Sequence, residues 1–218
     1  MNTYTEENYL KAIYHLSTEK GSIVTTNRIA ETLNTSAASV TDMLKKLAEK
    51  QLISYIKYQG ATLTDSGRKV AAYIVRKHRL WEVFLVDKLD FKWDEIHDIA
   101  EELEHINSIE LINRLDQFLG FPKSDPHGDP IPDNEGNYHH QTTIKVSKLN
   151  VGQQGSISGV SEHSPLFLQF LEKMGLTLGA MLQVKEVLAF DGSVTLIIGN
   201  TKEITISREV AKNILVVV

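Results

Sequence analysis

The sequence contains no cysteine and only five prolines among its 218 residues. The absence of cysteine excludes a disulfide framework, a thiolate zinc site, a cysteine-ligated iron–sulfur cluster and a thiol nucleophile. No apolar run approaches the ~18 residues of a membrane-spanning helix, and residues 1–16 lack the basic and apolar stretches of a signal peptide. We therefore expect a cytoplasmic globular protein of one or two domains, with room for a small third, and no membrane partner.

The formal net charge of -5 conceals three unlike regions. Residues 1–79 carry 12 basic and 7 acidic side chains, residues 80–140 carry 4 and 15, and residues 141–218 carry 7 and 6. Six of the eight histidines lie between positions 78 and 140. A basic first region suits phosphates. An acidic middle region is often only solvated surface, but its histidines point to cations.

Hydrophobic spacing and capping residues predict a helical first half. Helices are expected over residues 5–17, 26–33, 65–87, 94–106 and 110–119, with a further one that Ser36 caps. Thr5, Thr64 and Asp94 are the other expected caps. Residues 52–56 and 61–63 are predicted to form a hairpin around Gln59 and Gly60.

Residues 120–141 are rich in Pro, Gly, Asp and Asn, which predicts a loop and a domain boundary. After this loop the pattern becomes that of short strands, at 143–146, 155–160, 181–187, 194–198, 203–206 and 214–218. One helix, 165–174, interrupts them, and Gly175 suits its end. Short strands with a single helix predict a small barrel.

Residues 26–47 have the length and turn of a helix-turn-helix, and the following hairpin could act as a wing. The second helix begins with small polar residues, which let a helix N-terminus approach phosphates and base edges closely. Any three-helix cluster shares the apolar spacing, so the order of elements and the basic charge are the stronger signals. The candidate DNA-contacting residues are Arg28, Ser36, Ala38, Ser39, Thr41, Asp42, Lys45, Lys46 and Lys57. Among these, Asp42 would repel phosphate but could accept a hydrogen bond from cytosine N4.

Three sets of oxygen and nitrogen ligands lie within about 50 residues of sequence. They are Glu101, Glu104 and His105 with His97 on one predicted helix, the i, i+4 pair His78 and Glu82, and Asp125 with His127. Each set alone is more often solvated surface than a metal site. Carboxylates and imidazoles without thiolates suit Mn²⁺ or Fe²⁺ better than Cu(I) or structural zinc. Raw affinity at such ligands still favours Zn²⁺, Ni²⁺ and Cu²⁺, so selectivity would need geometry and cellular availability.

A basic winged helix, an acidic ligand-bearing middle and a small barrel together resemble the diphtheria toxin repressor family of metal-dependent regulators. The motifs that carry the resemblance are Arg76–Glu82, Ile96–Asp98, Leu103–His105, Glu7–Tyr14, Gly120–Lys123 and Pro126–Gly128. The segment Leu171–Leu176 is similar to the SH3-like domain that ferrous-iron transport accessory proteins share. The resemblance implies an α+β fold. Its domains would be a winged helix-turn-helix at 1–72, a helical dimerisation and metal-binding domain at 73–140, and an SH3-like β-barrel at 141–218.

The resemblance also implies two metal sites in each subunit. The primary site would use Glu101, Glu104, His105 and Asn8, and the ancillary site would use His78, Glu82, His97, Asp125 and His127, with Glu162 from the tail. Several positions depart from the family pattern. Asn8 stands where Asp or Met is common, and Lys11 stands where the manganese regulators have Glu. Glu101 and Asp125 replace cysteines of the iron and streptococcal branches, which tilts the expected metal towards Mn²⁺ over Fe²⁺.

The implied function is a homodimeric repressor of manganese or iron uptake genes that binds double-stranded operator DNA with Mn²⁺ or Fe²⁺ as co-repressor. No enzymatic activity and no small organic ligand are expected. One alternative is a di-iron type metalloenzyme, but only one Glu-x-x-His triplet of that kind appears among the candidate ligands. The other is a regulator of the multiple-antibiotic-resistance type, which would leave the acidic ligand cluster unexplained.

Overall fold

The computed structural model describes residues 2–17, 21–138, 141–199 and 201–218. These residues pack as two compact units. The first comprises residues up to His78, with 101–113 and 132–138, and the second comprises 79–100, 114–131 and the chain from there to Val218. The division of the chain into domains at 1–72, 73–140 and 141–218 stays a prediction.

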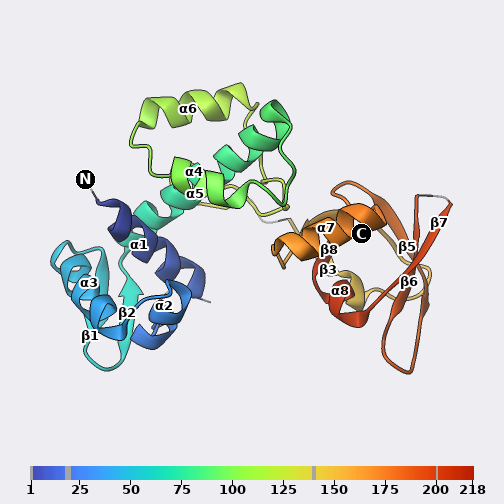
Figure 1. Ribbon diagram of the computed structural model, residues 1–218, viewed down its shortest axis with the longest axis horizontal. Helices are drawn as coiled ribbons and strands as arrows, with labels where there is room; N and C mark the ends of the chain where they lie inside the picture. Colours follow the sequence, from blue (N-terminus) through green and yellow to red (C-terminus); the bar gives the residue numbers. More distant parts are fainter. Residues whose placement is uncertain (1, 18–20, 139–140, 200) are drawn as a thin grey trace. The chain divides into compact units, whose positions relative to one another are not determined.

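The first unit contains a winged helix-turn-helix, drawn in blue to cyan in Figure 1. Helices α1 (Tyr4–Leu16), α2 (Thr26–Thr32) and α3 (Ala37–Glu49) precede the antiparallel strands β1 (Ile53–Ile56) and β2 (Gly60–Leu63). Leu10, Ile13, Ile29, Leu44 and Leu47 are fully buried in their common core. The register pairs Ile56 with Gly60, so residues 57–59 form the tip of the hairpin, as predicted.

The ends of these helices follow local capping chemistry. The Ser36 side chain accepts a hydrogen bond from the Ser39 amide, and the Thr64 hydroxyl accepts one from the Gly67 amide, so both predicted caps are confirmed. The first helix is present within a residue of its predicted bounds, but its predicted cap was wrong. Thr3, and not Thr5, is the N-cap, because Thr3 and Glu6 satisfy each other's backbone amides in a capping box.

Helices α4 (Asp65–Leu89), α5 (His97–Leu103) and α6 (Ile109–Phe118) form the middle of the chain. The predicted helix over 94–106 is too long at both ends. A turn precedes His97, and the Asp94 carboxylate accepts a hydrogen bond from Gln169 of the same unit instead of capping the helix. After Leu103 the chain turns tightly, since the Ile106 amide bonds to the Leu103 carbonyl. Glu104 and His105 therefore lie in a turn and not on a helix.

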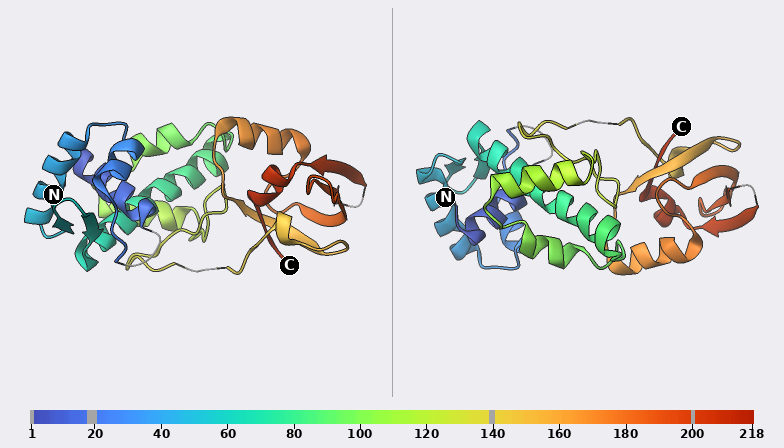
Figure 2. Two further views of the ribbon diagram at one scale, coloured as in Figure 1. Left: turned by 90° about the horizontal axis from the view of Figure 1, so that it is seen from below. Right: turned by 90° about the horizontal axis from the view of Figure 1, so that it is seen from above.

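The tail, in the second unit, forms an antiparallel sheet in the order β3-β8-β4-β5-β6-β7. Its strands are β3 (Ile144–Lys145), β4 (Gln154–Val160), β5 (Met181–Val187), β6 (Val194–Ile198), β7 (Lys202–Ile206) and β8 (Ile214–Val217). Helix α7 (Pro165–Met174) ends at Gly175 in the left-handed conformation, as predicted. Figure 2 shows α7, in orange, running beside the strands, and its Leu168 and Leu171 are buried in the core of the tail.

Two short elements escaped the sequence analysis: the 3-10 turn η1 (Val146–Lys148) and helix α8 (Arg208–Lys212). Both are too short for apolar periodicity to show them. The loop predicted over 120–141 is largely irregular where the structure describes it; residues 139–140 lie outside the described residues. No helix in the described chain is long and apolar enough to cross a membrane.

Candidate metal centre and nucleic-acid interface

The buried carboxylate of Glu104 is the centre of a polar cluster in the first unit. Glu104 is 0% exposed. The Lys11 ammonium on α1 lies 2.7 Å and 2.8 Å from its two oxygens, and His78 Nδ1 on α4 lies 2.7 Å from Oε2. Glu101 on α5 joins the cluster, with Oε2 at 2.5 Å from the same ammonium. Ligand atoms of His78, Glu101 and Glu104 all lie within 4.8 Å of one another.

Electrostatics hold Glu104 in its charged form. Burial alone would raise the pKa of this carboxyl group, but the hydrogen bond from His78 and the charge of Lys11 outweigh it. The pKa of Glu104 therefore lies below its ordinary value. A carboxylate that is already ionised can bind a cation without first releasing a proton.

His105 is oriented by a residue that the sequence analysis missed. His105 Nδ1 lies 2.7 Å from Oε2 of Glu7, and the Tyr4 ring stacks on the imidazole with a centroid distance of 3.6 Å. A carboxylate at Nδ1 favours the tautomer that carries its proton there, which leaves a lone pair on Nε2. Glu7 directly precedes Asn8 in sequence, but helical periodicity alone could not link it to a histidine 98 positions away.

Unpartnered polar atoms in the first unit fit a metal ion. Within the described residues, Asn8 Oδ1 and His105 Nε2 are buried without a hydrogen-bond partner. Glu104 Oε1 also accepts no hydrogen bond there, although the Lys11 charge is beside it, and it lies 3.7 Å from His105 Nε2. Buried polar atoms are normally satisfied. These three have lone pairs of the kind that divalent cations accept, so the donor set suits Mn²⁺ or Fe²⁺.

The second unit contains a separate group, in which ligand atoms of Glu82, Asp125 and His127 lie within 4.8 Å of one another. All three residues are buried. His127 Nε2 lies 2.8 Å from the Trp93 carbonyl, an acceptor, so Nε2 carries the proton and Nδ1 keeps its lone pair, 3.8 Å from Glu82 Oε1. The Nδ1 atom is therefore the ligand atom that this histidine can offer.

Burial dominates the titration of this group. It raises the pKa of the Asp125 carboxyl well above the ordinary value, with help from the nearby Glu82 charge and against the opposing charge of Arg79. It lowers the pKa of His127 and so favours the neutral imidazole, which is the form that binds metals. Asp125 also fixes its loop, because one carboxylate oxygen accepts the amide protons of His127 and Asp129.

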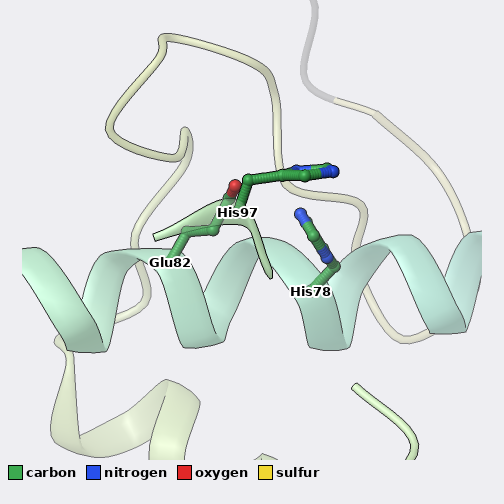
Figure 3. A group of neighbouring side chains, drawn as sticks. All are labelled: His78, Glu82 and His97. Carbon is green, nitrogen blue, oxygen red and sulfur yellow. The ribbon is translucent and has the colours of Figure 1, made fainter. Parts of the chain in front are cut away.

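Figure 3 shows the remaining predicted ancillary residues. His78 precedes Glu82 by one turn of α4, and the exposed His97, at the start of α5, lies beside them. These three residues also offer ligand atoms within 4.8 Å of one another. His78 thus belongs to two groups, since its Nδ1 atom also contacts Glu104.

The tail residue expected at the ancillary site, Glu162, lies at the surface of the second unit. The Glu162 carboxylate is exposed and accepts the amide proton of Ser164, and it belongs to none of the candidate metal groups among the described residues. The neighbouring His163 instead lies against His127, with ring centroids 4.9 Å apart. A histidine next to the predicted Glu162 was visible in the sequence, but its direction was not.

The predicted DNA-contacting residues lie on α2, α3 and the hairpin tip. Arg28, Ser36, Ala38, Ser39, Asp42, Lys45, Lys46 and Lys57 are exposed, and Thr41 is half-buried. Lys45 forms an exposed ion pair with Asp42 at 3.0 Å, so each offsets the other's charge on the outer face of α3. Tyr58 at the hairpin tip is 92% exposed, with the Lys57 ammonium 4.9 Å from its ring centroid.

Comparisons with known proteins match this arrangement along the chain. Residues 1–61 match the N-terminal DNA-binding domain of iron-dependent repressors, residues 64–133 match their metal-binding and dimerisation domain, and residues 144–218 match the FeoA domain. A solved manganese-dependent transcriptional repressor in complex with manganese superposes with a TM-score of 0.83 at 36% identity, covering 97% of this chain and 99% of that one.

Curated relatives agree. The iron-dependent repressor IdeR of Mycobacterium bovis is 37% identical over 128 residues, which is 59% of this chain and 55% of the relative. The regulator MntR of Oceanobacillus iheyensis is 35% identical over 125 residues, 57% of this chain and 84% of the relative. The match thus spans about half the length of the mycobacterial relatives.

The fold and the ligand clusters define a winged-helix regulator with a metal-binding and dimerisation domain and a β-rich tail. The chain belongs to the diphtheria toxin repressor family of metal-dependent, DNA-binding transcriptional repressors, a family of regulators and not of enzymes. The predicted family and fold class are confirmed.

Proposed function

We propose that this chain acts in the cytoplasm as a homodimeric repressor of metal-uptake genes, with Mn²⁺ or Fe²⁺ as co-repressor. The observation that carries the proposal is the buried His105 Nε2 atom, which has no hydrogen-bond partner among the described residues and lies 3.7 Å from the ionised Glu104. Asn8 Oδ1 on α1 is likewise buried without a partner there. These atoms belong to the same compact unit as the winged helix.

Two sites in each subunit are proposed. Glu101, Glu104, His105 and Asn8 would hold the regulatory ion, which supplies a divalent charge for these ligands to share. Glu82, Asp125 and His127, with His78 and His97, would form the ancillary site. His163 is a stronger candidate than Glu162 for the tail's ligand, because its ring already lies against His127.

The regulatory ligands link the DNA-binding helices to the helical middle of the chain. Asn8 lies on α1, whereas Glu104 and His105 lie in the turn after α5. The ion favours the arrangement of these segments that brings the ligands together. The size of this effect is set by the difference between the ion's affinity for that arrangement and its affinity for the alternative one. In a homodimer, two α3 helices would have to match half-sites about 34 Å apart or a multiple of it.

We propose Mn²⁺ rather than Fe²⁺ as the co-repressor. The cysteine-free sequence offers only hard oxygen and borderline imidazole ligands. The manganese-bound repressor described above is similar over nearly the whole chain. An anaerobic titration of the metal-free protein with Mn²⁺ and with Fe²⁺ compares the two directly.

DNA binding provides the test. A DNA ligand is first selected from random duplexes with the full chain and Mn²⁺, and then used in gel shifts with Mn²⁺, with Fe²⁺ and with chelator. Binding is expected only with metal, and equal binding in chelator would overturn the co-repressor proposal. Glu104→Ala and His105→Ala should each abolish the metal response but leave the dimer intact by light scattering. A normal response in both variants would show that the regulatory site lies elsewhere.

A further inference from the structure

An internal ammonium group lies among the carboxylates proposed to hold the regulatory ion. Lys11 Nζ is 2.5 Å from Glu101 Oε2 and 2.7 Å from Glu104 Oε1. Its side chain is only 13% exposed, and that of Glu104 is 0% exposed. This ammonium therefore lies on the oxygen of Glu104 that is nearest to His105 Nε2, at 3.7 Å.

The charges of the cluster define how much further positive charge it can take. Three carboxylates, those of Glu7, Glu101 and Glu104, lie with two ammonium groups, Lys11 and the buried Lys77, whose Nζ is 3.8 Å from Glu7. Counted over these carboxylates and ammonium groups alone, the formal charge is one negative. One divalent ion would overcompensate it, whereas the same cluster without the Lys11 charge would be neutralised by a single ion.

We propose that Lys11 is an internal competitor of the divalent ion, so that the ammonium and the ion are alternative partners of Glu101 and Glu104. The inference rests on the proposed metal centre and names the residue that sets its affinity. Two cations that share one buried carboxylate repel each other strongly, because little water screens them. Metal binding then requires Lys11 to leave Glu104. The measured affinity for the ion therefore equals the strength of its binding to the carboxylates less the strength of the Lys11 contacts that it replaces.

The competition also limits this cluster to one divalent ion. Lys11 is one helical turn beyond Asn8 on α1 and turns a positive charge towards the carboxylates. With Lys11 displaced, one divalent ion already neutralises the two remaining negative charges, so a second ion would meet no uncompensated negative charge. The same ammonium links α1 to Glu101 on α5 and to the turn that follows.

The test measures Mn²⁺ affinity, not repression. Full-length Lys11→Met, freed of metal with chelator, is titrated with Mn²⁺ while the free ion is followed by electron paramagnetic resonance. Met nearly preserves the length of the side chain and removes only the charge. We expect affinity for one Mn²⁺ to rise by roughly ten- to a hundredfold, the range of typical coupling between two binding events. An unchanged or weaker affinity would overturn the proposal.

Lys50→Met is the matched control. Lys50 Nζ lies 2.7 Å from Glu6, so this variant also removes a lysine–glutamate pair on α1, but outside the cluster. Its Mn²⁺ affinity should equal that of the wild type. Lys11→Arg retains the charge and should not show the rise; a rise equal to that of Lys11→Met would mean that charge is not the cause.

A second measurement covers the case in which Lys11→Met fails to fold. In the wild-type chain, Lys11 should react slowly with acetic anhydride without metal and faster at saturating Mn²⁺, as read by mass spectrometry. Equal reactivity in both states would show that Lys11 does not move aside. Failure of the metal centre itself is distinguishable, because Mn²⁺ binding would then survive unchanged in Glu104→Ala.

Discussion

The Nδ1 atom of His105 lies 2.7 Å from the Oε2 atom of Glu7, which joins the turn after α5 to the first helix. Neither side chain is more than 8% exposed. The contact fixes the orientation of the imidazole. Its other nitrogen, Nε2, is buried and has no hydrogen-bond partner among the described residues. Glu7 therefore acts on the candidate metal centre through His105 and is a positioning residue.

Glu7→Gln should weaken Mn²⁺ binding by about ten- to a hundredfold, the usual cost of losing a partner that orients a histidine ligand. An amide can still accept the proton of Nδ1, but it lacks the charge that raises imidazole basicity. Calorimetric titration of the metal-free chain gives the affinity. Glu6→Gln, on the adjacent residue, should leave it unchanged, because Glu6 bonds to Thr3 and Lys50 instead. Equal effects of the two variants would contradict the role of Glu7.

Gly128→Ala should destabilise the loop that positions Asp125 and His127. Gly128 has φ +88, and a Cβ there would lie 2.1 Å from the Ser158 carbonyl oxygen on β4, within the same unit. Gly120→Ala is the matched control, since Gly120 has φ +76 but no neighbouring atom within 4 Å of a Cβ. Left-handed strain alone costs about 1–2 kcal/mol. Chemical denaturation should show this loss for Gly120→Ala and a clearly larger one for Gly128→Ala; equal losses would mean that β4 yields.

Lys45→Ala and Lys57→Ala should weaken binding to all duplex sequences alike and reduce the salt slope by about one unit each, if each contacts a phosphate. Because Lys45 is paired with Asp42, Asp42→Ala should strengthen nonspecific binding. Fluorescence anisotropy across a range of salt concentrations measures both effects. Lys212→Ala, which removes a tail lysine paired with Glu209, serves as the control and should leave the slope unchanged. Salt slopes equal to that of the wild type in Lys45→Ala and Lys57→Ala would show that neither lysine contacts a phosphate.

Acid should weaken the fold through Glu104. Although burial opposes it, the bonds to His78 and Lys11 lower the pKa of Glu104 in the folded chain below the ordinary value of 4.5. The folded state thus binds fewer protons at this group than the unfolded state, so its contribution is present above pH 4.5 and is lost as the pH falls through the folded pKa. In chelator, the unfolding free energy of wild type relative to Glu104→Gln should fall with acidification. A difference independent of pH would contradict the shift.

Local patterns in the sequence determined most of the fold. Strands β5 and β6 and helix α7 occur at the predicted residues, because alternation of apolar residues and a helix-ending glycine are local signals. The winged helix could likewise be predicted from the Ser36 cap and from the order of its elements. The lack of cysteine restricted the ligands to oxygen and nitrogen before any folding was considered.

Tertiary structure decided how the ligands combine. Periodicity relates residues three or four positions apart, so it grouped Glu104 and His105 on one helix, whereas the chain places them in a turn. It could not show that Lys11, 93 positions away, would contact Glu104, or that His78 would do so from α4. Such contacts depend on the packing of α1 and α4 around this turn. The sequence by itself determined which residue types are available as metal ligands. Only the folded chain decided which of them lie together and which charged side chains contact them.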